Sequence, residues 1–182
     1  MLVRDRLYDE LARVDGECRF EVHQGRLREK PSMSYRHGRV SFNLGLQLGQ
    51  QLDLTQFEKR VNHGRVRRPG VTYYIPDVMV IPREIVGPDK DRPDVLETYD
   101  APRPFVAEVW SPSTGSYDVD EKLPEYRRRG DREVWRLHPF DRTLTAWRRV
   151  PTGTYSEIVY QGGLVPIHSL PSVTIDLDVL FA

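Results

Sequence analysis

Two apolar segments that each deliver one carboxylate constrain this chain more than any other feature. Residues 71–81 are rich in β-branched and aromatic side chains and predict a strand, in which Pro76 places Asp77 after a break in the hydrogen-bond ladder. Residues 104–110 predict a second, buried strand, and Glu108 directly follows its apolar run. Burying a carboxylate is costly unless a cation or hydrogen bonds compensate. Glu108 is therefore the sharpest local signal of function.

The segment after the second strand supplies a lysine. Residues 111–115 predict a turn, and residues 118–129 predict a helix that ends at Gly130 as a C-cap. Lys122 lies one turn after Asp118, on the same face as Asp118 and Tyr126. The spacing of Asp118 and Glu121 is also that of a capping box, which would give both residues a purely structural role. Pro124 predicts a distortion of the early turns.

The remaining pattern predicts one α+β or α/β domain over residues 1–182, because this length suits a single core. Helices are expected over residues 2–14 and 38–54, and a short one near the end, within 173–181. Hairpins are expected around Gln24-Gly25 and between residues 132–137 and 143–149, a turn or hairpin through residues 62–64, and a further strand over 154–160. Residues 82–103 predict a long loop.

Composition indicates a folded cytoplasmic protein. The chain is 38% apolar and 30% charged, which is typical of globular proteins rather than disordered ones. No run approaches the roughly 18 apolar residues that span a bilayer, and the start lacks a signal-peptide pattern. The lone Cys18 supplies neither an intramolecular disulfide nor a thiolate cluster for zinc.

Charge is balanced overall but uneven along the chain. Residues 19–68 contain eleven Lys or Arg and four Asp or Glu, whereas residues 77–125 contain five and twelve. A basic flank beside an acidic centre fits a phosphate-binding rim around a metal site. A surface that carries charge of both signs explains the same pattern.

These residue types suit metal-assisted hydrolysis of phosphodiesters. Two carboxylates from adjacent strands, here Asp77 and Glu108, are a sufficient protein contribution to bind Mg²⁺ (or Mn²⁺), with the Val109 carbonyl as a further ligand. Such an ion lowers the pKa of bound water and stabilises charge on the scissile phosphate. Lys122 could orient that water or help to deprotonate it. His37 is a lone histidine, and such residues are more often structural than ligands.

The same residues resemble a known family. Pro76-Asp77 followed by Glu108-Val109-Trp110 is similar to the motif of the PD-(D/E)XK nuclease superfamily. The run from Glu108 to Thr114, with Asp118, Lys122, Tyr126 and Trp135, looks like the Uma-type restriction endonuclease family, and the resemblance extends from Phe20 through His37 to Phe181.

The resemblance implies a restriction-endonuclease-like fold, in which a central mixed sheet is flanked by helices, with a divalent metal on Asp77 and Glu108. It makes Glu21 an auxiliary acid at the same site. Trp110 stands where the superfamily motif has lysine. In the Uma-type group that this chain resembles, the lysine is displaced onto the next helix, and the resemblance implies that Lys122 takes this role.

Three interpretations remain. The first is a metal-dependent endonuclease, a hydrolase that acts on DNA. A homodimer with Trp110, Trp135 or Trp147 at its interface is compatible with this interpretation. The second is a catalytically silent nucleic-acid-binding or interaction protein on the same fold. The third treats Asp77 as a turn residue and Glu108 as half of a buried salt bridge to an arginine. The intact set of two carboxylates and a lysine favours the enzyme.

Overall fold

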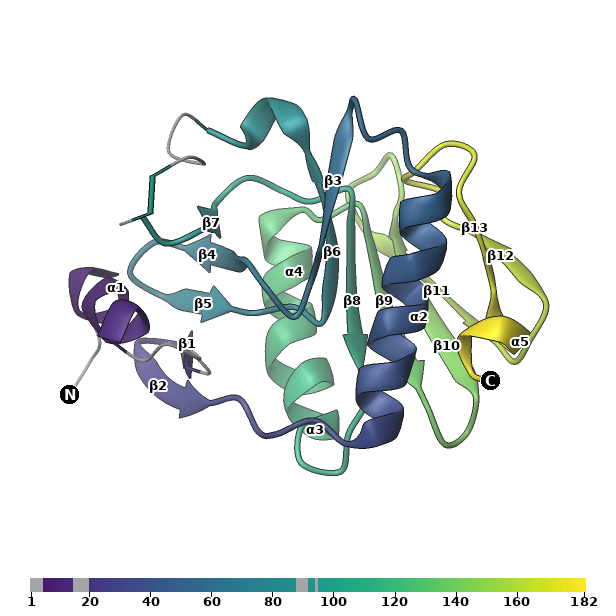
Figure 1. Cartoon of the computed structure of the whole chain (residues 1–182), viewed down its shortest axis with the longest axis horizontal. Helices are drawn as coiled ribbons and strands as arrows, with labels where there is room; N and C mark the ends of the chain where they lie inside the picture. The colour runs from purple at the N-terminus through teal and green to yellow at the C-terminus, as the bar shows by residue number, and fades with distance from the viewer. Residues whose placement is uncertain (1–4, 15–19, 88–91, 94) are drawn as a thin grey trace.

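A six-stranded mixed sheet lies at the centre of the computed structural model, which describes residues 5–14, 20–87, 92–93 and 95–182 (Figure 1). Its strand order is β11-β10-β9-β8-β6-β3, with β8 and β9 parallel and the other neighbours antiparallel. The strands are β3 (Phe57–Val61), β6 (Val78–Pro82), β8 (Phe105–Val109), β9 (Glu133–His138), β10 (Thr143–Arg149) and β11 (Tyr155–Tyr160).

Helices cover both faces of this sheet, as predicted. In Figure 1, α2 (Tyr35–Gln51) crosses in front of the strands and α4 (Leu123–Arg129) lies behind them. Side chains alternate along β8, so that Phe105 and Ala107 pack in the core cluster with α2 while Val106 packs in the cluster with α4. Glu108 follows the same alternation as Val106. Its carboxylate is therefore directed toward the α4 side of the sheet.

A second, smaller sheet has the order β2-β1-β5-β4-β7. It contains β1 (Phe20–His23), β2 (Arg26–Glu29), β4 (Arg65–Arg68), β5 (Thr72–Tyr74) and β7 (Thr98–Tyr99). The predicted first hairpin is confirmed, and Gln24 (φ 49°) and Gly25 (φ 74°) supply the two left-handed residues of its tight turn. Helix α1 (Asp5–Val14) packs Tyr8 against Tyr73 of this sheet. Residues 2–4 of the predicted first helix lie outside the described residues.

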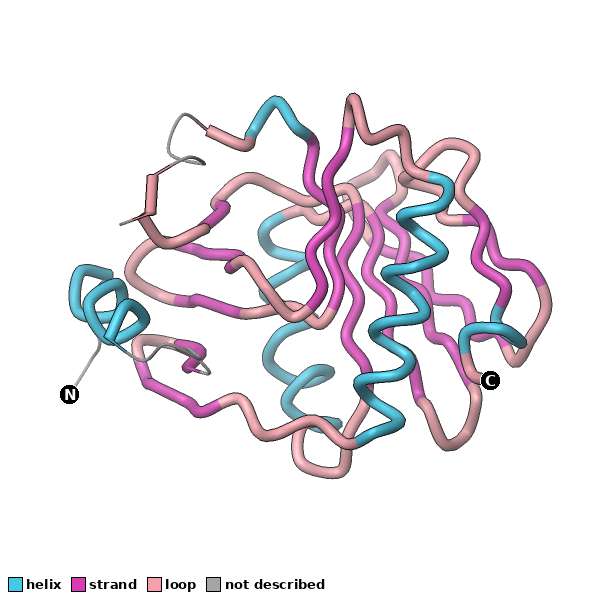
Figure 2. Tube along the Cα trace, viewed as in Figure 1, coloured by secondary structure: helices cyan, strands magenta, loops and turns pink. Residues whose placement is uncertain are grey.

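Two short connections, β3–β4 and β5–β6, cross between the two sheets, which the sequence did not predict. The turn or hairpin expected through residues 62–64 is a turn but not a hairpin, because β3 pairs with β6 in the large sheet whereas β4 pairs with β5 in the small one. The single strand expected over residues 71–81 is likewise two strands in different sheets (Figure 2). Left-handed conformations at Asn62 (φ 52°) and Gly64 (φ 75°) turn the chain at the first crossing. Pro76 and Asp77 form the second.

Helix boundaries differ from expectation where capping decides them. Helix α2 begins at Tyr35 rather than residue 38, because the Ser34 side chain accepts a hydrogen bond from the His37 amide. The helix after β8 begins three residues early, as α3 (Gly115–Tyr117), continues through a π-helical turn, η3 (Asp118–Lys122), and ends as α4 at Gly130 (φ 87°). The predicted distortion near Pro124 is this π-helical turn. Leu123 donates to the Asp118 carbonyl, and Pro124 has no N–H to continue the regular pattern.

The C-terminal part completes the α2 side of the core. Strands β12 (Leu164–Pro166) and β13 (Thr174–Asp176) pair, and α5 (Leu177–Leu180) follows, so the predicted final helix occupies only part of its range. The long predicted loop contains the short 3-10 helix η1 (Arg83–Ile85) and β7.

Two of the tryptophans proposed for an interface are buried. Trp135 is fully buried and Trp147 is 5% exposed, so neither can serve a dimer as expected. Among the described residues, no helix combines the length and apolar character that a membrane span requires.

Candidate active site

Asp77 lies where the chain leaves the small sheet and enters the large one. The backbone at this crossing bonds to side chains instead of a neighbouring strand: the Ile75 amide donates to Glu21 Oε1 (2.8 Å), and the Ile75 carbonyl accepts from Lys30 Nζ (2.8 Å). The Asp77 carbonyl accepts from the Asn62 amide (2.8 Å). Because the backbone is not paired with a strand at the break predicted at Pro76, Glu21 and Lys30 bond to it and lie close to Asp77.

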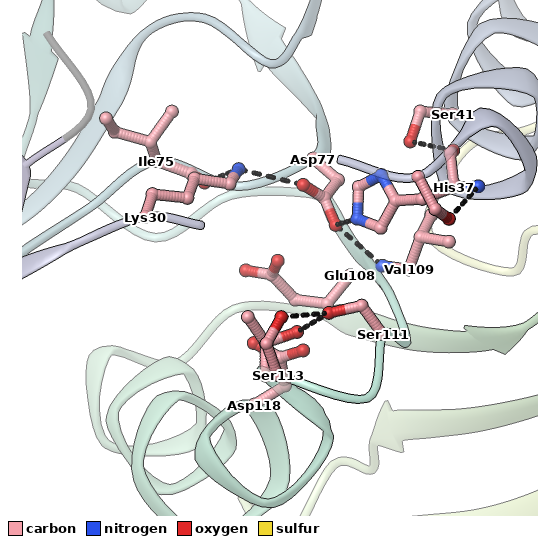
Figure 3. A network of polar contacts seen from close by, with 12 residues as sticks. Lys30, His37, Ser41, Ile75, Asp77, Glu108, Val109, Ser111, Ser113 and Asp118 are labelled. Carbon is pink, nitrogen blue, oxygen red and sulfur yellow. Dashed lines mark hydrogen bonds and ion pairs between the residues drawn. The ribbon is translucent and has the colours of Figure 1, made fainter. Parts of the chain in front are cut away.

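The Asp77 carboxylate is buried among three donors (Figure 3). Oδ1 accepts from Lys30 Nζ (2.8 Å), while Oδ2 lies 3.0 Å from His37 Nε2 and accepts from the Val109 amide (2.8 Å). Burial alone would raise the pKa of Asp77, but Lys30 and His37 outweigh it and hold that pKa below its usual value. Asp77 is therefore not the simple turn residue of the third interpretation.

Lys122 lies at the centre of a second buried cluster, which contains three carboxylates. Its Nζ lies 3.0 Å from Glu21 Oε1, 3.3 Å from Glu108 Oε1 and 3.6 Å from Asp118 Oδ1. Burial alone would lower the pKa of Lys122, but the three carboxylates raise it well above its usual value. The cation paired with Glu108 is thus a lysine and not the arginine that the third interpretation expected.

The π-helical turn positions Lys122 and Asp118 on the sheet side of their helix. The predicted capping box is wrong: the helix starts before Asp118, whose buried carboxylate faces Lys122 instead of a helix N-terminus. One turn further on, the Tyr126 hydroxyl donates to Glu108 Oε1. Three successive turns of one helix therefore contact the site.

Carboxyl groups outnumber cationic side chains in the lining of this pocket. Four of the carboxyl groups are buried, those of Glu21, Asp77, Glu108 and Asp118, and Glu29 adds an exposed one, beside Arg28, Lys30 and Lys122. Burial, followed by repulsion from Asp77 and Asp118, raises the pKa of Glu108 to about 8 even though Lys122 opposes the shift. Burial likewise raises the pKa of Asp118. An additional cation would relieve this repulsion.

The donor set fits a hard divalent cation that keeps part of its water shell. Carboxylate oxygens are the ligands that Mg²⁺ and Mn²⁺ prefer, and Mg²⁺ commonly takes only one or two of them from protein. Within the described ranges, no group of three or more His, Cys, Asp or Glu side chains is arranged to hold a metal by itself. The buried hydroxyl of Tyr117, which also lines the pocket, makes no hydrogen bond to the described residues. Water and main-chain oxygen would have to complete the coordination.

The structure brings together all four side chains predicted to be catalytic: Glu21, Asp77, Glu108 and Lys122. It adds Lys30, which no pattern in the sequence singles out, and Asp118, which had been explained as a cap. His37 also contacts Asp77 directly. The sequence feature that could have pointed to this histidine is its position at the start of a predicted helix. Trp110, at the usual lysine position, turns away to stack on His138 (ring centroids 4.2 Å apart).

Two hydroxyl side chains, of Ser111 and Thr114, also line the pocket. Ser111 Oγ lies 3.1 Å from Ser113 Oγ and 2.9 Å from Thr114 Oγ1 (Figure 3). The Gly115 that follows has no room for a side chain, because a Cβ there would lie 2.0 Å from Trp110 Nε1. The Ser-Pro-Ser-Thr-Gly turn is thus fitted between the pocket and Trp110.

The chain is similar to a protein family and to solved structures. A model of the Uma2 family, described as "Putative restriction endonuclease", matches residues 6–179. A crystal structure from Anabaena variabilis, described as a "putative nuclease belonging to DUF820", superposes with a TM-score of 0.73 at 16% identity and covers 89% of each chain. That likeness establishes a shared fold. No curated protein matches the sequence.

Proposed function

The chain belongs to the Uma2 family of restriction-endonuclease-like proteins, and from this premise we propose that it is a metal-dependent endonuclease that hydrolyses DNA phosphodiester bonds. The observation that carries the proposal is the convergence of Glu21, Asp77, Glu108 and Asp118 on one pocket around Lys122. We further propose that residues 1–182 form a single nuclease-like domain.

Asp77 and Glu108 are the side chains that would hold Mg²⁺ or Mn²⁺, with the Val109 carbonyl as a further ligand. When bound, the ion would lower the pKa of a coordinated water and stabilise negative charge on the scissile phosphate. Asp77 is prepared for this role because His37 and the Val109 amide fix its Oδ2. Glu108 is fixed by the Tyr126 hydroxyl.

Lys122 would act as a charged hydrogen-bond donor. Its raised pKa keeps the ammonium protonated near neutral pH, so it can orient an attacking water or a phosphate oxygen but cannot take a proton from water. Glu21 bonds both Lys122 and the Ile75 amide, and thereby ties the lysine to the crossing that carries Asp77. We assign Glu21 a positioning role.

The alternative is a catalytically silent binding protein on the same fold. Buried carboxylates that repel one another lower stability, and a protein that only binds would gain nothing from them. This argument favours the enzyme. A homodimer, which would bring two sites to one duplex, stays a prediction that analytical ultracentrifugation can test.

A cleavage assay tests the proposal. The purified protein would be incubated with supercoiled plasmid and with single-stranded DNA, in Mg²⁺, Mn²⁺ or EDTA. We expect metal-dependent nicking that Asp77→Asn, Glu108→Gln and Lys122→Met each abolish. Asp77→Asn and Glu108→Gln preserve side-chain volume, so a loss of activity would report the lost charge.

Asp120→Asn is the matched control, because Asp120 lies on the same π-helical turn as Lys122 but is exposed. It should cleave like the wild type. Calorimetric titration of Mg²⁺ into wild type and Asp77→Asn gives a readout independent of cleavage. Metal binding that Asp77→Asn leaves unchanged, or cleavage that survives all three substitutions, would refute the assignment.

A further inference from the structure

A groove opens beside the candidate active site, between the first turns of α2 and the β9–β10 turn. Its volume is about 310 Å³, and its walls include Tyr35, Arg36, Arg39, Pro139, Arg142 and Phe181. We call it the arginine groove. None of the described side chains that line it is acidic. It therefore presents positive charge on a partly apolar floor.

No carboxylate of the described residues neutralises the guanidinium groups of this groove, in contrast to several other arginines of the protein. Arg60, Arg67 and Arg68 each pair with a carboxylate. Across the described part of the chain, by contrast, Arg36, Arg39 and Arg142 form no ion pair. Asp141, the nearest acidic residue in sequence, lies 3.3 Å from His138 Nδ1. Unpaired arginines grouped in one groove suit a polyanion such as a phosphate backbone.

A row of rings borders the groove. The centroids of Trp110 and His138 are 4.2 Å apart, and Phe140 lies 6.1 Å from Trp110 in an edge-on arrangement. The Arg36 guanidinium lies over the Phe140 ring at 5.7 Å. We call Trp110, His138 and Phe140 the aromatic ledge. Phe140 is 52% exposed and Tyr35, at the groove's edge, is 78% exposed, so both can contact a flat ligand.

Both features continue directly into the candidate active site. Trp110 follows Val109, whose amide donates to Asp77, and Arg36 precedes His37, whose Nε2 lies 3.0 Å from Asp77. A strand seated in the arginine groove would therefore reach the carboxylates within a short distance along its backbone. A second groove is less suited, because the acidic side chains of Asp120, Glu121 and Glu125 line it together with its arginines.

We propose that the arginine groove and the aromatic ledge bind an unpaired nucleic-acid strand. The phosphates would lie against Arg36, Arg39 and Arg142, and unstacked bases would lie on Phe140 and Tyr35. Stacking requires an exposed base face, which a closed duplex does not offer. This inference rests on the proposed function and specifies its substrate as single-stranded or locally unpaired DNA.

The test measures binding by fluorescence anisotropy, with the full chain in EDTA so that no cleavage intervenes. The probes are a labelled strand of about 15 nucleotides, its blunt duplex, and an abasic strand of equal length. We expect the single strand to bind at least about tenfold more tightly than the duplex. Phe140→Ala should weaken binding of the normal strand roughly tenfold and leave the abasic strand unchanged, because only stacking is lost.

Arg142→Ala should weaken binding of the normal and abasic strands alike, and should reduce the slope of log affinity against log salt by about 0.7. Phe42→Ala and Arg149→Ala are the matched controls, since Phe42 is 65% exposed on α2 outside the groove and Arg149 is exposed at the far end of β10. Both should bind every probe like the wild type.

Equal affinity for strand and duplex, or a Phe140→Ala variant that binds the normal strand like the wild type, would overturn the inference. Displacement of the strand by polyglutamate at equal charge concentration would assign the groove to acidic proteins and would also overturn it. The two proposals fail separately. Cleavage of DNA with binding unaffected by Phe140→Ala and Arg142→Ala refutes only the groove, whereas groove-dependent binding without hydrolysis refutes only the enzyme.

Discussion

The ammonium of Lys30 lies 2.8 Å from Oδ1 of Asp77 and, on its other side, 2.8 Å from the Ile75 carbonyl. A cation of the protein itself thus rests on the carboxylate that we propose as a metal ligand. Lys30 follows β2 and its side chain is 15% exposed, so the ammonium can move toward solvent. In this arrangement Lys30 and a divalent ion compete for the same oxygen.

Lys30→Met should therefore bind Mg²⁺ or Ca²⁺ more tightly than the wild type, by roughly tenfold, because removing one nearby positive charge is worth about 1–2 kcal/mol in a partly solvated site. Calorimetric titration measures the effect. Lys59→Met, on β3, is the control and should leave metal affinity unchanged. Weaker metal binding by Lys30→Met would mean that Lys30 supports the carboxylate instead of competing with the ion.

Lys122→Met should destabilise the metal-free protein by about 3–5 kcal/mol, because Glu21, Glu108 and Asp118 then lack their shared cation. Urea denaturation in EDTA at pH 8 gives the free energy of unfolding. The loss should shrink toward pH 5, because Glu108, whose pKa is raised to about 8, becomes protonated and no longer needs the cation. A loss that is equal at both pH values would mean that packing, not charge, is responsible.

The raised pKa of Glu108 leads us to expect an unusual dependence of the free energy of unfolding on pH. Its folded-state pKa of about 8 exceeds the ordinary value of 4.5, so the folded protein binds more protons than the unfolded chain between these values. The stability that Glu108 contributes is complete below about pH 4.5 and is lost as the pH rises through about 8. Metal-free wild type should accordingly be less stable at pH 8 than at pH 5.

Glu108→Gln should remove much of that loss and raise the free energy of unfolding at pH 8 by roughly 2 kcal/mol in EDTA. This is less than the full shift implies, because glutamine also gives up the attraction to Lys122. Urea titrations at pH 5 and pH 8 measure the difference, with Asp120→Asn as the exposed control. A Glu108→Gln variant less stable than wild type at pH 8 would show that the anion is well accommodated without metal.

The loss of activity on replacing Glu21 should depend on which residue replaces it. Glu21→Gln keeps an oxygen to accept from Ile75 and Lys122, and we expect kcat to fall by roughly tenfold with little change in metal affinity. Glu21→Ala removes both bonds and should cost at least about another tenfold. Single-turnover cleavage beside metal titration separates the two effects. A large loss of metal affinity in Glu21→Gln would instead make Glu21 a metal ligand.

Local signals in the sequence identified most elements and the centre of the site. The apolar run before Glu108, the break at Pro76 and the helical spacing of Asp118, Lys122 and Tyr126 are all short-range patterns. They were sufficient because strand alternation and helix periodicity fix the direction of a side chain within its own element. These patterns predicted one α+β or α/β domain, whereas the mixed sheet flanked by helices was implied by the family resemblance.

Pairing between distant segments could not be read in this way. Residues 57–61 and 65–68 look like two arms of a hairpin, and only the competition between two sheets separates them. Lys30 likewise has no local signal, because its partners Ile75 and Asp77 are more than forty residues away. A capping role explained Asp118 from the sequence alone. In the structure, its carboxylate is instead buried beside Lys122.

By itself, the sequence determined which side chains could bear chemistry and on which face of their own strand or helix each one lies. The tertiary structure alone decided that the Pro76–Asp77 crossing joins two sheets, and so which cations meet which carboxylates. The physical reason is that a buried carboxylate is governed by charges within a few ångströms. In this fold those charges come from β1, the segment after β2, the first turn of α2 and the π-helical turn.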